Sequence, residues 1–311
     1  MPTDELPTAA VLLSHYNGLN FLRDQIESLL NQQGVNVHVY VRDDGSTCTK
    51  SLNNLRHIDA SHDCVSVIYG ENLGSCNSFF LMVELYGGAD FYAFSDQDDV
   101  WDLDKLQKAV LLLQATHKAD EPALYFSNLN IVDESLNFIS LMHKEQFPLT
   151  FDYAFFRNKC SGCTMVFNNK LRDTYLPAGR PAYAVMHDWW FLLFAYCVGS
   201  VVYDSAPSIN YRQHSSNVIG AKHSYYKRWK DRLRRLLFSE QGRNERLKQG
   251  RALLNVAGDI MSAEKYALLS RLVATKRDFK TKLQLCKHYH QCMSNRFEGF
   301  FVSLIIMLNL Y

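Results

Sequence analysis

Short apolar runs alternate with amphipathic segments along the first third of the chain. Four of these runs predict buried strands, and a polar turn follows each one. Apolar residues at helical spacing come next, as in the face formed by Leu22, Ile26 and Leu29. This repeated order predicts an α/β fold with a mostly parallel central sheet and helices on both faces. The predicted strands are 9–13, 37–41, 65–69 and 89–94.

The alternation weakens after about residue 120, and from about residue 224 the pattern becomes helical and basic. We therefore expect an α/β domain at 1–220, with halves at about 9–120 and 121–220, and a helical C-terminal region at 221–311. The second half is predicted to contain strands at 123–127, 131–133, 162–167, 201–203 and 208–211, and an apolar helix at about 186–197.

Polar pairs recur at the same end of successive predicted strands. Taken singly, each pair suits a turn or a helix cap. The carboxyl ends of parallel strands meet at one edge of a sheet, however, and α/β proteins bind their ligands there. The residues 96–99 carry three carboxylates that repel one another, which favours a divalent cation with a diphosphate as its partner. The sequence thus predicts a nucleotide site, and the pairs are Tyr16 and Asn17, Asp43 and Asp44, and Asp96 and Asp98.

Composition excludes several classes of protein. The net charge of +1 gives no sign of a nucleic-acid partner, and a hydrophobic fraction of 47% is enough for a sizeable core. No G-x-G-x-x-G follows the first strand and no G-x-x-x-x-G-K-[ST] occurs, which excludes a dinucleotide-binding Rossmann domain and a P-loop. No signal peptide or membrane-spanning run is recognised.

The eight cysteines form no disulfide framework, which favours a reduced cytosolic setting. Cys160 and Cys163 are a lone C-x-x-C without a second pair. In the run 286–292, a helix places Cys286 and His290 on one face and the remaining His and Cys on another. A strand would stretch the four over roughly 20 Å. Neither geometry closes a tetrahedron, so no zinc site is predicted from either motif.

An ordered set of motifs resembles the family 2 glycosyltransferases of the GT-A fold, and among them bacterial rhamnosyltransferases of surface polysaccharide synthesis. The set covers about residues 9 to 220, and one departure is Leu103, where many members of the family have proline after the acidic motif. The motifs are SHYNG at 14–18, RDDGS at 42–46, ENLG at 71–74, SDQDDVW at 95–101, HDW at 187–189 and YRQHSSN at 211–217.

The resemblance implies a role for each matching residue. Tyr16 and Asp44 are expected to stack on and hydrogen-bond the pyrimidine, and Asp96 lies nearer the ribose. Asp98 is the expected ligand of a Mn or Mg ion in the D-x-D motif, and His214 is either a further ligand or an ordinary surface histidine. The other donor-binding candidates are Ser14, Asn17, Asp43 and Asn72.

The resemblance also implies an inverting transfer of a sugar from a nucleotide diphosphate to a hydroxyl of a glycan. Asp188 matches the catalytic base, although an aspartate there also suits a helix N-cap. Gly162, Trp189 and Trp190 are the acceptor-binding candidates. The expected donor is dTDP-rhamnose or a UDP-hexose, and the acceptor is a lipid-linked glycan of O-antigen or capsule synthesis. The alternatives are a non-catalytic GT-A-like nucleotide-sugar-binding module and, more distantly, a sugar nucleotidyltransferase.

The basic composition of the C-terminal region favours contact with an anionic surface, and the alternative is an ordinary solvated helical face that packs on the catalytic domain. Between Lys222 and Arg251 there are eleven Lys or Arg against three Asp or Glu. The apolar run 300–310 is too short to span a bilayer, so it is expected to pack on other helices, pair with a second subunit, or lie in a membrane interface. The resulting prediction is peripheral, salt-sensitive association with the inner face of the cell membrane.

Overall fold

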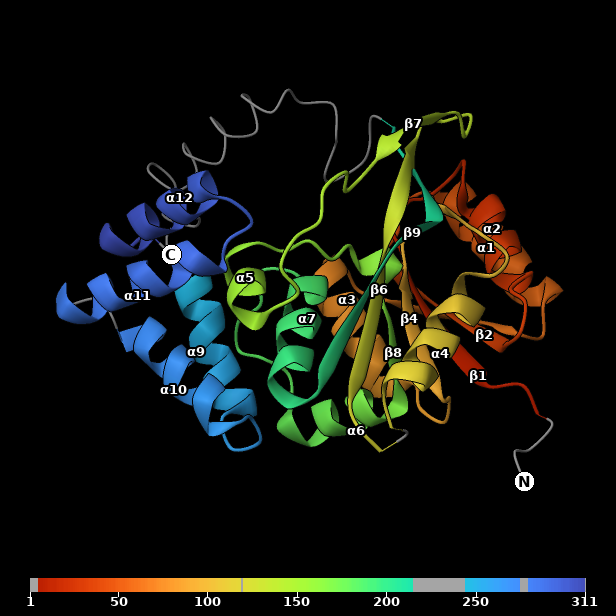
Figure 1. Ribbon diagram of the computed structural model, residues 1–311. Helices are drawn as coiled ribbons and strands as arrows, with labels where there is room; N and C mark the ends of the chain where they lie inside the picture. The colour runs from red at the N-terminus through yellow and green to blue at the C-terminus, as the bar shows by residue number, and fades with distance from the viewer. Residues whose placement is uncertain (1–4, 119, 215–243, 275–278, 311) are drawn as a thin grey trace. The chain divides into compact units, whose positions relative to one another are not determined.

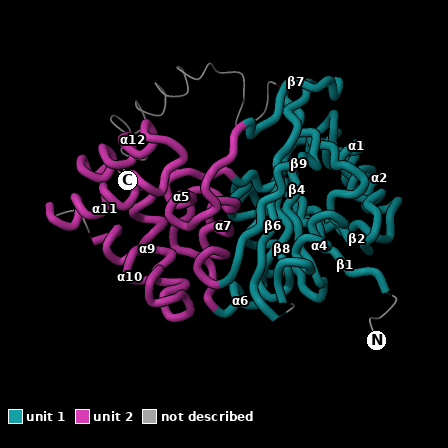
Figure 2. The backbone as a smooth tube through the Cα atoms, viewed as in Figure 1, with its two compact units in different colours: residues 1–144, 160–177, 199–213 teal, residues 145–159, 178–198, 214–311 magenta. Residues whose placement is uncertain are grey.

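The computed structural model describes residues 5–118, 120–214, 244–274 and 279–310. The chain forms two compact units, shown in Figure 2. Unit 1 comprises 1–144, 160–177 and 199–213, and unit 2 comprises 145–159, 178–198 and 214–311. The chain therefore leaves unit 1 twice before the C-terminal helices begin. The division into domains at about residue 220 stays a prediction.

Unit 1 is built on a nine-stranded sheet with the order β3-β2-β1-β4-β8-β6-β9-β5, and β7 pairs with β6 at the side (Figure 1). The first four strands in that order are parallel, as are β6 and β9, whereas β8, β5 and β7 run antiparallel to their neighbours. The predicted α/β fold is confirmed, with its parallel half at the N-terminal strands. The strands are β1 (Thr8–His15), β2 (Asn36–Asp44), β3 (Val65–Gly70), β4 (Phe91–Ser95), β5 (Val100–Trp101), β6 (Ala123–Val132), β7 (Phe138–Leu141), β8 (Val166–Asn168) and β9 (Ser200–Arg212).

Helices cover both faces of this sheet, as side-chain alternation in β4 demonstrates. Phe94 lies 5.1 Å from Phe79 of α3, ring centroid to ring centroid, while its neighbour Ser95 accepts a hydrogen bond from Gln25 of α1. Successive side chains of a strand point to opposite faces, so α1 and α3 lie on opposite sides. Helix α6 packs with α3, since Arg172 donates to the carbonyl of Val83. The helices are α1 (Leu22–Leu30), α2 (Thr49–Ser61), α3 (Ser75–Leu85), α4 (Lys105–Thr116) and α6 (Asn169–Ala178).

Two long strands replace pairs of short ones that the sequence predicts. The polar run 127–130 suggests a break, yet β6 continues through it because the register against β9 shifts there. The buried side chain of Asn128 forms hydrogen bonds with backbone groups beside this register shift. Its Oδ1 accepts from the amides of Leu129 and His143, and its Nδ2 donates to the carbonyl of His143 at 2.9 Å. The predicted strand 162–167 is likewise wrong at its start, which forms the 3-10 helix η1 (Gly162–Thr164) before β8.

Unit 2 is helical, which confirms the prediction for the described part of the C-terminal region. Its apolar helix α7 is buried around most of its circumference. Asn295 is the N-cap of helix α12, and its side chain accepts from the amide of Glu298. Glu298 in turn pairs with Arg157. The described helices of this unit are α5 (Phe151–Phe156), α7 (His187–Val198), α9 (Glu245–Ala257), α10 (Ala263–Ala274), α11 (Phe279–Cys292) and α12 (Arg296–Met307).

Among the described residues, one face of α12 is buried and another is exposed. Val302 and Ile306 are buried, whereas Phe300, Leu304 and Leu308 are 64%, 40% and 52% exposed. Among the described residues, no helix combines the length and the apolar character that a membrane crossing requires.

Candidate functional site

The carboxyl ends of β1, β2 and β4 meet at one edge of the sheet in unit 1. Parallel pairing aligns His15 with Asp43 and Leu13 with Ser95, so the loops that follow these strands begin at the same level. Tyr16 and Asn17 leave β1 there, and Asn72 follows β3. The sheet thus brings together the predicted donor-binding residues of unit 1, as the switch-point rule requires.

Helix α1 holds the acidic loop that follows β4. Gln25 and Ser28 lie on one face of α1, Gln32 follows two residues after the helix ends at Leu30, and all three side chains are buried. Gln25 Nε2 donates to Ser95 Oγ at 2.6 Å, and Ser28 Oγ accepts from the amide of Trp101 at 3.1 Å.

Gln32 acts at the far end of the same loop. Its Nε2 donates to the carbonyl of Asp102 at 2.8 Å and its Oε1 accepts from the amide of Leu106 at 3.0 Å. Uncharged side chains thus bind the Ser95 hydroxyl before the carboxylates and backbone groups after them.

Arg212 of β9 secures the same loop from another strand. Its amide donates to Asp99 Oδ1 at 3.2 Å and its Nε to the carbonyl of Asp98 at 3.1 Å. Its Nη2 reaches Asp24 of α1 at 3.0 Å. The guanidinium is buried and directed at backbone and at Asp24, so it orders the loop.

The three carboxylates of the loop differ in environment. Asp99 is fully buried, whereas Asp96 and Asp98 are half-buried. Burial raises the pKa of Asp99 well above its usual range, and the nearby charges of Asp96 and Asp98 raise it further. Ligand atoms of Asp96, Asp99 and Cys163 lie within 4.8 Å of one another. Burial also raises the pKa of Cys163 well above its usual range, which makes the thiol a poor partner for a hard cation.

The oxygen ligands Asp96 and Asp98 fit Mn or Mg better than that mixed cluster does. They reach solvent, they offer only oxygen, and their mutual repulsion with Asp99 would be relieved by a positive ion.

Gln97, between the two aspartates of the D-x-D motif, positions Tyr16. The amide of Tyr16 donates to Gln97 Oε1 at 2.9 Å, and Gln97 Nε2 donates to the carbonyl of Tyr16 at 3.3 Å. A side chain at Gly18 would approach Gln97 to 2.6 Å, so glycine leaves room for this contact. The Tyr16 side chain remains 48% exposed and is available for stacking.

A buried pair links the ends of β1 and β2. His15 Nδ1 lies 2.9 Å from Asp43 Oδ1, and Asp43 Oδ2 accepts from the amide of Ser46 at 3.0 Å. The Asn17 side-chain oxygen accepts from the amides of Thr47 and Cys48, each at 3.0 Å, at the start of α2. Asn17 therefore fixes the two residues that precede α2, and it has a left-handed backbone conformation with φ of 50° that asparagine tolerates. The two predicted donor-binding residues Asn17 and Asp43 both have structural roles in this arrangement.

Asp44 is held by a second buried pair, with Arg42. Asp44 Oδ1 also accepts from the amide of Leu73 at 2.8 Å, and Arg42 Nη2 donates to the carbonyl of Glu71 at 2.8 Å. A side chain at Gly70 would meet Arg42 Nη2 at 2.7 Å. Ser14 joins this group through Ser78, whose Oγ is 2.9 Å from its own. The loop after β3 is thus tied to the end of β2.

The remaining predicted residues lie elsewhere. Asp188, Trp189 and Trp190 belong to unit 2, Gly162 lies in η1 of unit 1, and His214 is the first residue of unit 2 after β9. Asp188 is half-buried in the first turn of α7, one residue inside the helix, and its Oδ1 accepts from the amide of Trp189 at 2.5 Å. It does not occupy the N-cap position, because the helix already begins at His187.

Both tryptophans pack inside unit 2. Trp189 Nε1 donates to the carbonyl of Ala154 at 2.7 Å, and Trp190 is fully buried. Burial favours a packing role over contact with an acceptor sugar, and their acceptor-binding role stays a prediction. Burial lowers the pKa of the adjacent His187 to about 3, so this imidazole is neutral.

Comparison with known proteins agrees with this arrangement of motifs. The model of the family "Glycosyl transferase family 2" matches residues 10–170, more than half of the chain. The chain belongs to glycosyltransferase family 2. It is therefore an enzyme of glycosyl transfer, and the suspected resemblance is confirmed.

Two kinds of relative resemble this glycosyltransferase. The dTDP-rhamnosyl transferase RfbG of Shigella flexneri is 27% identical over 237 residues, which cover 70% of this chain and 77% of RfbG. An uncharacterized glycosyltransferase of Rickettsia bellii is 24% identical over 222 residues, 67% of this chain and 30% of that longer protein.

Among solved structures, S. aureus TarS 1–349 in complex with UDP-GlcNAc has a TM-score of 0.53 at 16% identity and covers 92% of this chain and 80% of its own. The complex of TarS 1–349 with UDP has a TM-score of 0.54 at 14% identity, with the same coverage. At this identity the likeness establishes the GT-A-like fold alone.

Sequence reasoning missed several residues that hold the site of this glycosyltransferase together. Gln25, Ser28 and Gln32 show a three-and-four spacing, but a polar stripe beside an apolar face looks like an ordinary solvated face. Arg212 lies within a recognised motif, yet nothing in the motif indicates its contacts. Gln97 occupies the variable position of the D-x-D motif, which carries no signal of its own.

We predict that Gln32→Leu lowers the free energy of unfolding by about 2–4 kcal/mol, because it leaves the carbonyl of Asp102 and the amide of Leu106 without their partner. Urea unfolding measures the change. The matched control is Gln33→Leu, an exposed neighbour, for which a change within about 0.5 kcal/mol is expected. Equal effects of the two substitutions would show that Gln32 does not hold the loop.

Proposed function

We propose that this enzyme is an inverting, metal-dependent glycosyltransferase that transfers L-rhamnose from dTDP-rhamnose to a hydroxyl of a lipid-linked glycan in O-antigen or capsule synthesis. The observation that carries the proposal is the convergence of Asp43, Asp44, Asp96 and Asp98 at one sheet edge in a family 2 member. The name of RfbG supports the choice of donor, and a UDP-hexose is the second candidate.

The pyrimidine of the donor stacks on the exposed ring of Tyr16 in this proposal. Gln97 fixes the backbone of Tyr16, so the ring starts from a defined position. The carboxylate of Asp44, held by Arg42 and by the amide of Leu73, hydrogen-bonds the base edge. Since both residues are already anchored, little conformational entropy is lost when the nucleotide binds.

Asp98 holds the divalent cation in our proposal, assisted by Asp96. Such a cation, when bound, supplies positive charge against the diphosphate leaving group. The backbone of this loop is fixed by Arg212 and the uncharged side chains of α1, so the carboxylates keep their relative positions through repeated turnovers. His214 is kept as a candidate further ligand on the strength of the family motif.

We predict that Asp98→Asn weakens Mn²⁺ binding, measured by electron paramagnetic resonance in the presence of dTDP, by about tenfold or more. The matched substitution Asp99→Asn leaves Mn²⁺ binding within about threefold, because Asp99 is buried and its carboxylate accepts from the amide of Arg212. A larger loss of Mn²⁺ binding in Asp99→Asn than in Asp98→Asn would assign the ion to the cluster of Asp96, Asp99 and Cys163 instead.

Asp188 acts as the general base in our proposal and removes the proton of the acceptor hydroxyl as it attacks. Its first-turn position on α7 and the buried tryptophans beside it keep the carboxylate in place. The same side chain accepts a hydrogen bond from the amide of Trp189 in the first turn of α7, so the two roles must be separated by substitution.

Asparagine separates them because its side-chain oxygen can still accept that hydrogen bond but takes up no proton at neutral pH. Asp188→Asn is expected to slow rhamnosyl transfer by about 10²–10⁴-fold, with the affinity for dTDP-rhamnose and the melting temperature unchanged. Initial rates and isothermal titration calorimetry measure these quantities. Asp259→Asn, an exposed position of unit 2, serves as the control. Full activity of Asp188→Asn would exclude it as the base, and a loss of donor affinity would indicate a binding role.

We also propose that the enzyme associates with the inner face of the cell membrane, where a lipid-linked acceptor is held. The basic segment 226–237 that suggests this lies outside the described residues. The exposed apolar side chains Phe300, Leu304 and Leu308 of α12 offer a second, uncharged contact. Pairing of two subunits through these helices is the competing use of the same surface.

Each basic residue near an anionic surface contributes about 1 kcal/mol. We therefore predict that replacing Arg234 and Arg235 by Glu weakens co-sedimentation with anionic vesicles by about tenfold or more. Lys50→Glu on α2, with its exposed side chain, is expected to have no effect. Binding that is equal on neutral and anionic vesicles, or insensitive to salt, would contradict the electrostatic mechanism.

A further inference from the structure

Three side chains with different ligand atoms meet in unit 2, where α5 packs against α11. Asp152 lies in the first turn of α5, and His288 and Cys292 lie one turn apart on α11. His288 Nε2 is 2.8 Å from Asp152 Oδ1, and Cys292 Sγ is 3.6 Å from the same nitrogen. One ligand atom from each of the three residues falls within 4.8 Å of the others. None of these residues has a role in the proposed sugar transfer.

The packing of α11 fixes this meeting point. Tyr289, the neighbour of His288, is fully buried and its ring lies 4.8 Å from that of Phe156 at the end of α5. This contact sets the rotation of α11, so that His288 and Cys292, four residues apart on one face, are directed at Asp152. The segment 286–292 alone supplies only two ligands per helix face, and for that reason its sequence predicts no zinc site. The third ligand is 136 residues away in the chain.

The distances suit a tetrahedral ion. With zinc at about 2.3 Å from sulfur and about 2.0–2.1 Å from nitrogen, tetrahedral angles place sulfur and nitrogen about 3.6 Å apart. That is the observed separation of Cys292 Sγ and His288 Nε2. The same geometry requires about 3.3 Å between nitrogen and oxygen, so Asp152 must withdraw by about half an ångström from its present hydrogen bond. His288 and Asp152 are 44% and 20% exposed, which gives the ion an entry path and the side chains room to move.

The ligand set selects the class of ion. Imidazole nitrogen and thiolate sulfur favour zinc and other late divalent ions, whereas Mg²⁺ and Ca²⁺ prefer oxygen alone. We propose that Asp152, His288 and Cys292 bind one zinc-like cation, with water as the fourth ligand, and so link α5 to α11. On binding, the Cys292 thiol releases its proton to solvent, and His288 presents the lone pair of Nε2 with its proton on Nδ1.

Two other roles for the cluster are weaker. A reactive thiol needs a lowered pKa, but burial and the charge of Asp152 raise the pKa of Cys292 to about 11. If Asp152 and His288 form only a hydrogen bond with each other, Cys292 has no role. Substitution of Cys292 therefore distinguishes this alternative from a metal site.

The test is binding of Co²⁺ and Zn²⁺ by the full-length, metal-stripped protein. Cobalt coordinated by thiolate gives a charge-transfer absorption band that an all-oxygen site lacks, which separates this site from the D-x-D motif. We expect the band in the wild type, with zinc displacing cobalt at one equivalent. Cys292→Ser is expected to abolish the band, and His288→Ala and Asp152→Asn to weaken Zn²⁺ binding by about tenfold or more.

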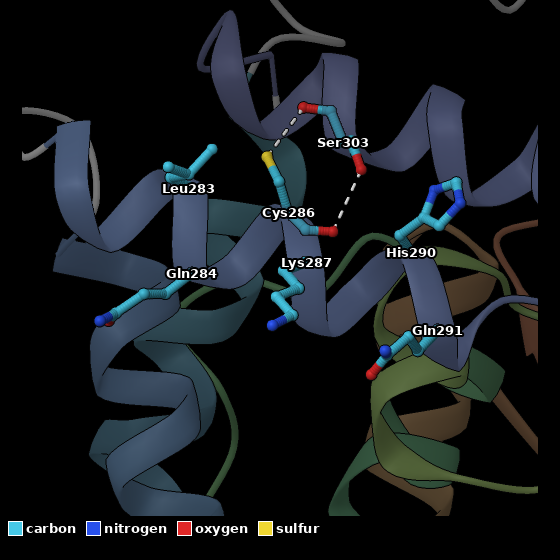
Figure 3. A pocket seen from close by; sticks show the side chains of 7 residues that line it. All are labelled: Leu283, Gln284, Cys286, Lys287, His290, Gln291 and Ser303. Atoms are coloured by element: carbon cyan, nitrogen blue, oxygen red, sulfur yellow. Dashed lines mark hydrogen bonds between the residues drawn. The ribbon is translucent and has the colours of Figure 1, made fainter.

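Matched controls come from the other face of α11, shown in Figure 3. Cys286 and His290 line a pocket of about 500 Å³ there, and Cys286 Sγ contacts the carbonyl of Ser303 at 3.4 Å. Cys286→Ser and His290→Ala should leave the cobalt band and the zinc affinity unchanged. Circular dichroism establishes that each variant is folded. A band that survives Cys292→Ser, or one absent from the folded wild type, would overturn the proposal, and neither result bears on sugar transfer.

Discussion

The proposed donor site of this glycosyltransferase depends on how three neighbouring carboxylates are held at the end of β4. Asp96, Asp98 and Asp99 repel one another, and the sheet ends where they begin. Uncharged side chains of α1, and Gln32 just after it, hydrogen-bond the Ser95 hydroxyl before the acidic residues and backbone groups after them. A cationic clamp on the carboxylates themselves would compete with a metal ion, and the amide and hydroxyl groups of α1 avoid that competition.

The two carboxylates at the end of the neighbouring strand β2 are stabilised in a different way. The carboxylates of Asp43 and Asp44 are both paired, with His15 and with Arg42, and both pairs are buried. A buried carboxylate that loses its partner costs about 3–5 kcal/mol, so each pair constrains the sequence strongly. The pairs also connect loops, since Asp43 reaches the amide of Ser46 and Arg42 reaches the carbonyl after β3. The nucleotide half of the enzyme is thus rigid where it must present fixed polar atoms.

The second unit obtains its order mainly from apolar packing. Helix α7 buries tryptophan, phenylalanine and leucine side chains, and the predicted base Asp188 stands at its first turn. A base on a well-packed helix keeps its position more accurately than one on a loop. At the other end of the unit, the contact of Tyr289 with Phe156 orients α11 and thereby brings His288 and Cys292 to Asp152. Apolar packing therefore fixes the orientation of α11, and this orientation brings the polar side chains of the cluster together.

The sequence by itself determined the class of fold and the location of the acidic site, because both depend on local patterns. Strand–turn–helix repeats and pairs of polar residues at strand ends are visible within windows of a few residues. What only the tertiary structure decided depends on residues far apart in the chain.

Gln25 and Gln32 look like solvated helix positions until Ser95 and Asp102, each 70 residues away, are placed beside them. From the sequence, Asn128 suggests a break in a strand, but in the structure its side chain donates a hydrogen bond to the carbonyl of His143 and the strand continues. The physical reason is the same in each case: the hydrogen bond that gives a buried polar side chain its role is formed with a partner that only folding brings near.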